Sequence, residues 1–303
     1  MTRVNRELVF VHGRAQQHKD PEALKAEWIS DLKAGLAKSD LELPIDETAV
    51  RYPFYGDTLV DLVSGRSGED AAEVVVKGAA DDAAERAFFE AFLGETKDRF
   101  GITDAQLTAA MGGDPVVGKG IQNWPIVLGI LKALDDNLDW VSGGAIAIAT
   151  NDVYHYLTNI RISKVIDDGV RQAMTPDVET VVVAHSLGTI VAYKLLRREG
   201  EAAGWKVPHF ITLGSPLGVR TVTNVLAPLQ HPKVVTKWSN AYDPHDVVAL
   251  HPLEKPWFGV KPGIANKGDV VNDTGNKHGI SGYLGDKEVA RWIYDALTAP
   301  SGP

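Results

Sequence analysis

The chain contains no cysteine among its 303 residues. This absence excludes disulfide bonds, thiolate metal sites and a cysteine nucleophile together. Long apolar runs are also missing, since the nearest candidate, residues 126–149, is interrupted by four charged residues: Lys132, Asp135, Asp136 and Asp139. A membrane span needs about 18 or more apolar residues in succession, and the first residues show no secretory pattern. The sequence therefore predicts a cytoplasmic protein with no integral membrane segment.

The chain also has fewer positively charged than negatively charged residues. Lysine and arginine number 31 against 40 aspartate and glutamate residues, which gives a formal net charge of −9. A general nucleic-acid binder needs a basic stripe, so this class is disfavoured. The sequence also lacks a Walker loop, a dinucleotide glycine fingerprint and an HExxH motif. We therefore expect no nucleic-acid partner, no cofactor and no metal.

Apolar runs and amphipathic patterns alternate along most of the chain. The first apolar run is followed by Leu24, Trp28, Leu32 and Leu36, whose four-residue spacing predicts a helix with one buried face. Buried strands are predicted at residues 7–12, 48–52, 180–184, 209–213 and 233–238. Alternation of this kind is typical of an α/β sheet.

Residues 57–159 follow a different pattern. They contain helical periodicity and glycine-rich breaks but no convincing buried strand. We interpret them as a helical insertion within a single domain that spans residues 1–303. Most of its apolar side chains are expected to attach the insertion to the core, and a substrate-binding wall or lid is the alternative.

The pentapeptide Ala184-His185-Ser186-Leu187-Gly188 lies between a β-branched strand and an amphipathic helix. A serine in such a turn stands clear of the sheet, and the small residues on either side let strand and helix approach closely. The helix N-terminus then places unpaired N–H groups beside developing negative charge. Ser186 is therefore predicted to be a nucleophile, which requires a base and an acid that orients it.

This turn resembles the nucleophile turn of the α/β-hydrolase superfamily, in particular its lipase and esterase branches, with alanine at the first glycine of G-x-S-x-G. Residues 9–14 resemble the first strand of that family with its His-Gly turn. The resemblance implies a mostly parallel central sheet with helices on both faces and a helical cap. It also implies an oxyanion hole built from the backbone N–H groups of Arg14 and Leu187. We expect His12 to be structural.

The resemblance further implies the chain order serine, acid, histidine, with the histidine in a late loop before the last helix. His278 occupies that place. Two carboxylates follow the predicted strand 233–238, namely Asp243 and Asp246. Asp246 precedes a hydrophobic pair, as in the class 3 lipase pattern, and is the preferred acid. Asp243 precedes a proline, a common turn pair, and remains the alternative.

Two further segments adjoin the expected site. A Gly-Ser-Pro turn follows the strand at 209–213, and Gly214 and Ser215 are expected to line the floor of the site. Oxygen-bearing side chains also precede His278, at Asp269, Asn272, Asp273 and Asn276. They are interpreted as an Asx-rich turn, with a calcium brace as the alternative.

The expected function is a serine hydrolase that cleaves a small-molecule or lipid-like carboxylic ester through a Ser186–His278–Asp246 triad and an acyl-enzyme. One alternative is an acyltransferase or thioesterase that uses the same triad. Another is a ligand-binding receptor or scaffold of the same fold without significant turnover, because fold does not dictate function. The natural substrate and the oligomeric state are left open.

Overall fold

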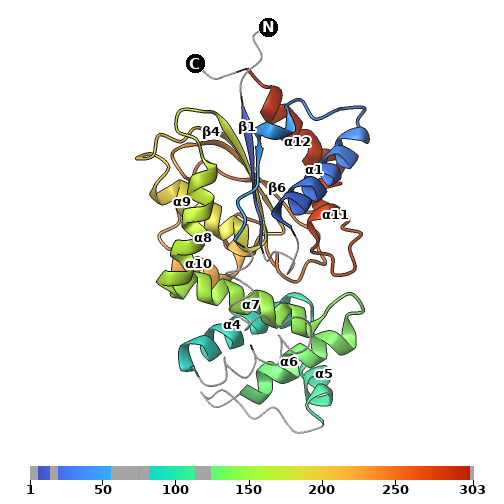
Figure 1. The fold of residues 1–303 in the computed structure, drawn as a ribbon. Coiled ribbons are helices and arrows are strands. Elements are labelled where there is room, and N and C mark those ends of the chain that lie inside the picture. The colour runs from blue at the N-terminus through green and yellow to red at the C-terminus, as the bar shows by residue number, and fades with distance from the viewer. Residues whose placement is uncertain (1–5, 14–19, 56–74, 76–81, 113–123, 301–303) are drawn as a thin grey trace.

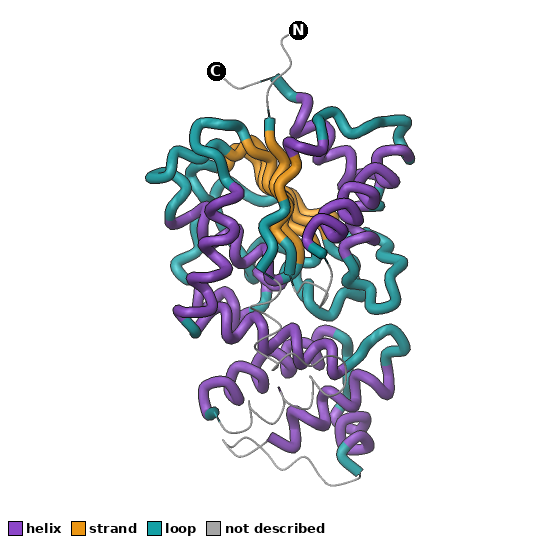
Figure 2. The backbone as a smooth tube through the Cα atoms, viewed as in Figure 1, coloured by secondary structure: helices purple, strands orange, loops and turns teal. Residues whose placement is uncertain are grey.

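A parallel sheet forms the centre of the protein. The structure is a computed structural model that describes residues 6–13, 20–55, 75, 82–112 and 124–300. Within these residues the sheet has six strands in the order β2-β1-β3-β4-β5-β6, all parallel (Figure 2). The strands are β1 (Glu7–Val11), β2 (Val50–Arg51), β3 (Thr180–His185), β4 (Val207–Leu213), β5 (Val235–Ala241) and β6 (Ala265–Lys267).

The strand order reverses beside β1. The chain passes from β1 to β2 on one side and later returns to β3 on the other side. In an open parallel sheet, the loops that leave two such strands diverge and create a crevice at their carboxyl ends. The register pairs Val11 with Ala184, so the residues that follow these two positions meet at the same edge.

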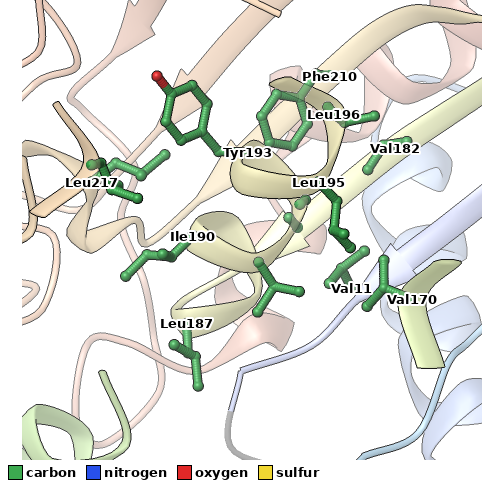
Figure 3. Packing of buried hydrophobic residues seen from close by; sticks show 14 of the residues in the cluster. Val11, Val170, Val182, Leu187, Ile190, Tyr193, Leu195, Leu196, Phe210 and Leu217 are labelled. Atoms are coloured by element: carbon green, nitrogen blue, oxygen red, sulfur yellow. The ribbon is translucent and has the colours of Figure 1, made fainter. Parts of the chain in front are cut away.

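Helices cover both faces of the sheet (Figure 1). Because side chains alternate along a strand, Leu8 and Phe10 face one layer while Val9 and Val11 face the other. The first layer contains α1 (Pro21–Ala37), α11 (Ile280–Leu284) and α12 (Lys287–Thr298), and the second contains α8 (Ile160–Ala173), α9 (Leu187–Arg198) and α10 (Arg220–Leu226). Figure 3 shows part of the second layer, with Leu195 beside Val11 and Val182 of the sheet.

Within the described residues, four more helices lie beyond the carboxyl ends of the strands (Figure 1). They are α4 (Ala83–Arg99), α5 (Asp104–Ala110), α6 (Trp124–Asn137) and α7 (Gly143–Thr158). These helices have an apolar cluster of their own, which includes Phe89, Leu134 and Ile146. Val247 and Val248, from the loop after β5, join the same cluster. We call these helices the α4–α7 layer.

The predicted mixed α/β class, a parallel sheet flanked by helices, is confirmed. The described parts of residues 57–159 are helical, whereas residues 57–74, 76–81 and 113–123 of that segment lie outside the described residues. The predicted strand 48–52 is shorter than expected, because Asp46 caps a 3-10 turn at Glu47–Ala49 and only Val50–Arg51 pairs with β1. The predicted strand 233–238 lies at Val235–Ala241.

Strand β6 was not predicted. Its three residues, Ala265–Lys267, form no apolar run and are only partly buried or exposed, so no hydrophobic pattern marks them. None of the helices in the described ranges has the length and apolar character needed to cross a bilayer.

Packing between the sheet and α12 leads to a stability prediction. Ile293 is fully buried against the first layer, so Ile293→Ala should lower the free energy of unfolding by about 2–5 kcal/mol through lost burial and a residual cavity. Urea unfolding of the two proteins measures this difference. Arg291→Ala, on the exposed side of the same helix, is the control and should change stability by less than about 0.5 kcal/mol. Equal losses in the two variants would contradict the packing described here.

Candidate active site

Ser186 is the single residue between β3 and α9, and its backbone is strained. It has φ 54° and ψ −130°, which is a rare conformation for a residue with a side chain. Its N–H donates to the carbonyl of Leu213 at 3.1 Å, and its carbonyl accepts from the N–H and the hydroxyl of Thr189. These bonds hold the turn, while the side chain of Ser186 makes no capping bond to α9.

The turn is possible because two glycines allow close backbone approach. A Cβ at Gly188 would lie 2.3 Å from the carbonyl oxygen of Val11, and a Cβ at Gly13 would lie 2.6 Å from Cβ of Ser186. Ala184 is fully buried at the other small position. The loop after β1 and the start of α9 therefore meet directly at Ser186.

His278 lies on a loop before α11 and contacts Ser186 from across the crevice. Its Nε2 is 2.9 Å from Oγ of Ser186, and its Nδ1 is 2.7 Å from Oδ2 of Asp246. The side chain of Asn276 accepts from the N–H of His278 at 3.1 Å. A neutral imidazole fits both ring contacts, because it can accept the serine proton at Nε2 while donating from Nδ1 to the carboxylate.

Asp246 is 1% exposed and accepts four hydrogen bonds. Besides His278, its Oδ2 accepts from the hydroxyl of Tyr283 at 2.5 Å. Its Oδ1 accepts from the N–H groups of Val248 and Ala249 at 2.8 and 3.2 Å. Burial by itself raises the pKa of Asp246, but the neighbouring His278 and these hydrogen bonds outweigh it and lower the pKa below its usual value. The carboxylate is thus ionised where it meets His278.

Asp243 has a different role in the same loop. Its Oδ1 accepts from the N–H of His245 and its Oδ2 from the N–H of Asn272, both at 2.7 Å. These bonds connect the loop after β5 to the loop that carries His278. Between the two carboxylates that the sequence left open, the structure brings Asp246, and not Asp243, to the imidazole of His278.

His185, the residue before Ser186, is also bonded to His278. Its Nε2 lies 2.8 Å from the backbone carbonyl of His278. A carbonyl can only accept, so His185 must carry its proton on Nε2. Burial, with a smaller contribution from the neighbouring His278, lowers the pKa of His185 to about 3. His185 is therefore a neutral donor.

His12 orders the loop after β1, in agreement with its predicted structural role. Its Nδ1 donates to the carbonyl of Gly13 at 2.7 Å, and its Nε2 accepts from the N–H of Tyr55 at 3.3 Å. The hydroxyl of Tyr55 also donates to the carbonyl of His12. Burial lowers the pKa of His12 to about 4.

A cavity of about 1000 Å³ opens at Ser186 and His278 and is bounded on the far side by α7. This volume is within the usual range for small-molecule sites. Its apolar lining includes Trp28, Phe92, Trp140, Ala145, Ile148, Ala149 and Val248. Carboxylates also reach it, at Glu27, Asp135 and Asp152. The α4–α7 layer thus supplies one wall of the cavity.

The structure describes one of the two predicted oxyanion donors, Leu187, but not the other, Arg14. Leu187 begins α9 and lines the cavity beside Ser186, and the first N–H groups of a helix have no partner within the helix. Arg14 lies outside the described residues.

The prediction that Ser215 lines the floor of the site is wrong. Its Oγ is 2.7 Å from Oγ1 of Thr189 and accepts from the N–H of Leu217, and the residue is 2% exposed. Ser215 therefore holds α9 through Thr189 and does not line the cavity. Gly214 does adjoin the site, since it has φ +53° and a Cβ there would lie 3.0 Å from Oδ2 of Asp246.

The oxygen-bearing residues before His278 make turn contacts. Asn272 is buried, donates to the carbonyl of Gly279 and accepts from Thr274. Asp269 pairs with Lys267 at 2.7 Å. Among the described residues, no group of three metal-ligating histidine or carboxylate side chains occurs.

Sequence reasoning missed two contacts of the site. Tyr283 was not predicted to belong to the site, yet its hydroxyl, at the end of the short helix α11, reaches Asp246. The contact of His185 with the carbonyl of His278 joins residues 93 apart, and no local pattern marks such a pair.

No protein-family model matches the chain, and no curated protein matches it. The class that fold and site define is a mixed α/β protein in which a serine, a histidine and an aspartate form a continuous hydrogen-bonded chain at the carboxyl edge of a parallel sheet.

Buried neutral histidines make stability depend on pH. Burial lowers the pKa of His185 and His209 to about 3 and that of His12 to about 4, whereas an unfolded histidine titrates near 6.5. The unfolded chain then binds more protons between these values, so stability is full above about pH 6.5 and falls as pH decreases. Each such histidine contributes up to ~1.4 kcal/mol per pH unit.

Urea unfolding from pH 7 to pH 5 tests this dependence. His209→Gln removes one of these histidines at a distance from Ser186. It should reduce the slope of the unfolding free energy against pH by the contribution of one proton, up to ~1.4 kcal/mol per pH unit. An unchanged slope would show that His209 is not buried in its neutral form.

Proposed function

We propose that the protein is a serine hydrolase that cleaves carboxylic esters through an acyl-enzyme intermediate. The observation that carries the proposal is a continuous series of two hydrogen bonds, from Oγ of Ser186 to Nε2 of His278 and from Nδ1 of His278 to Asp246. Ser186 and His278 line a cavity that a substrate could occupy. Geometry and role, rather than chain position, define such a triad. Backbone strain at Ser186 adds support, because strained residues persist where a function requires them.

In the first half of the reaction, Oγ of Ser186 attacks the carbonyl carbon of the ester while its proton moves to Nε2 of His278. The tetrahedral oxyanion that forms is stabilised by the N–H of Leu187 and the positive end of α9. The N–H of Arg14 is the second donor in this proposal. His278 then gives its proton to the departing alkoxide, and the alcohol leaves an acylated Ser186.

In the second half, a water molecule replaces the alcohol. His278 takes a proton from the water, whose oxygen attacks the acyl carbon, and collapse of the intermediate releases the acid and returns the proton to Ser186. Asp246 remains ionised throughout. It holds the Nδ1–H tautomer of His278 and stabilises the imidazolium that forms in each half.

The strand order supports the finer assignment to an α/β-hydrolase fold. The candidate nucleophile follows β3, at the position where the order reverses and where a ligand crevice is expected. In this proposal the α4–α7 layer is the cap that limits the access of water and shapes the substrate site. The apolar wall of the cavity suits an ester with an apolar acyl or alcohol group.

Ser186→Ala tests the nucleophile. Labelling by a fluorophosphonate probe should disappear, and hydrolysis of p-nitrophenyl esters should fall by about 10⁴-fold or more. Ser215→Ala is the matched control, because it removes a neighbouring serine hydroxyl that faces α9 and should keep the label. A labelled Ser186→Ala protein would refute the assignment. A folded wild type that binds esters without turnover or labelling would instead favour the receptor alternative.

The two candidate acids can be separated by a pair of isosteric variants. Asp246→Asn should lower kcat by about 10⁴-fold, because a neutral amide no longer stabilises the imidazolium or fixes its tautomer. Asp243→Asn should affect stability more than kcat, since the carboxylate of Asp243 bonds to the backbone N–H groups of His245 and Asn272 and to the ring of His245. Steady-state kinetics with a p-nitrophenyl ester decide the matter, and a larger loss in Asp243→Asn would reverse the assignment.

A further inference from the structure

Two consecutive residues hold His278 at two different points. The side chain of Ser186 contacts Nε2 of the imidazole at 2.9 Å, and the side chain of His185 contacts the backbone carbonyl of the same residue at 2.8 Å. The proton transfer uses only the first contact. The second joins the end of β3 to the loop before α11.

The ring of His185 is held in place on several sides. Its centroid is 4.7 Å from that of His278, 5.9 Å from that of Tyr283 and 6.2 Å from that of Trp28. The residue is only 9% exposed. Packing of this kind limits the side chain to one rotamer, so Nε2–H of His185 points at the carbonyl of His278 without further ordering.

We propose that His185 is a positioning residue whose Nε2–H bond to the carbonyl of His278 keeps the imidazole aligned with Ser186 through both proton transfers. The inference rests on the function proposed above. It assigns to the residue before the nucleophile a task that depends on its own side chain rather than on the turn.

The physical reason lies in what changes during the reaction. When His278 becomes an imidazolium, its Nε2 can no longer accept from Ser186, so that contact cannot hold the loop in every state. The bond from His185 to the backbone carbonyl is not altered by the proton on the ring. His185 also stays neutral, because burial keeps its pKa near 3, so it adds no positive charge beside the imidazolium.

Two variants of His185 distinguish the effect of its hydrogen-bond donor from the effect of its side-chain packing. His185→Gln keeps an N–H donor near the position of Nε2, whereas His185→Met keeps a side chain of similar size without a donor. His209→Met is the control, since His209 on β4 is also buried and bonds Ser239 at 2.8 Å. Each variant is compared with wild type in kcat, in KM for a p-nitrophenyl ester and in thermal unfolding.

For His185→Met we expect kcat to fall by about 10- to 100-fold, because a displacement of about 1 Å at a reacting group has effects of this size, while KM changes little. His185→Gln should recover kcat to within about threefold of wild type, because the positioning bond is remade. His209→Met should lose stability without this loss of kcat. The inference is overturned if His185→Met retains wild-type kcat, or if the Gln variant is as impaired as the Met variant.

A second readout does not depend on ester hydrolysis. Proton NMR of the full chain should show the Nδ1–H of His278, hydrogen-bonded to Asp246, as a far-downfield resonance in wild type and in His185→Gln. In His185→Met the resonance should broaden or disappear, and in His209→Met it should remain. Wild type could prove inactive toward esters while the resonance is still present in wild type, His185→Gln and His209→Met and lost in His185→Met. In that case the proposed function fails and the positioning role stands. An unaltered resonance in His185→Met refutes the positioning role whatever the activity.

Discussion

The direct contact between the backbones of β1 and α9 is the constraint on which the rest of the site depends. A single Cβ at Gly188 would place a carbon 2.3 Å from a carbonyl oxygen of β1, which no packing tolerates. With glycine at position 188, α9 starts at Leu187, two residues after β3 ends at His185. Ser186, the residue between them, has a positive φ. The same approach brings the loop of His12 and Gly13 against Ser186. The cavity opens beside this turn, at Ser186 and His278.

Much of this arrangement could be predicted because local chemistry determines it. The β-branched run before Ser186 and the amphipathic pattern after it require a strand and a helix with a very short turn between them. The absence of cysteine excluded disulfide bonds and a cysteine nucleophile, and the net charge of −9 disfavoured a nucleic-acid binder. His278 was identified from its place in the chain order, and the structure brings it to Ser186.

The contacts that could not be predicted are those made between distant segments. Asp243 and Asp246 are three residues apart and have the same chemistry. The sequence favoured Asp246, and the folded loop brings its carboxylate rather than that of Asp243 to the imidazole. Tyr283 reaches Asp246 through a short helix whose geometry no spacing rule conveys. Ser215 resembled a site residue in sequence, but its turn directs the hydroxyl toward Thr189 and α9. Tertiary geometry, rather than propensity, settled each case.

The loop of Asp246 belongs to two structural units at once. Val247 and Val248 follow the carboxylate directly and are buried in the apolar cluster of the α4–α7 layer, and Trp140 donates from its ring to the carbonyl of His245 at 3.2 Å. Proteins open locally in cooperative units whose free energies are smaller than that of global unfolding. An opening of the α4–α7 layer alone would therefore remove the packing around Val247 and Val248, next to the carboxylate of Asp246, while the sheet is still folded. The hydrogen bonds among Ser186, His278 and Asp246 thus depend on the packing of these helices as well as on the sheet that carries Ser186.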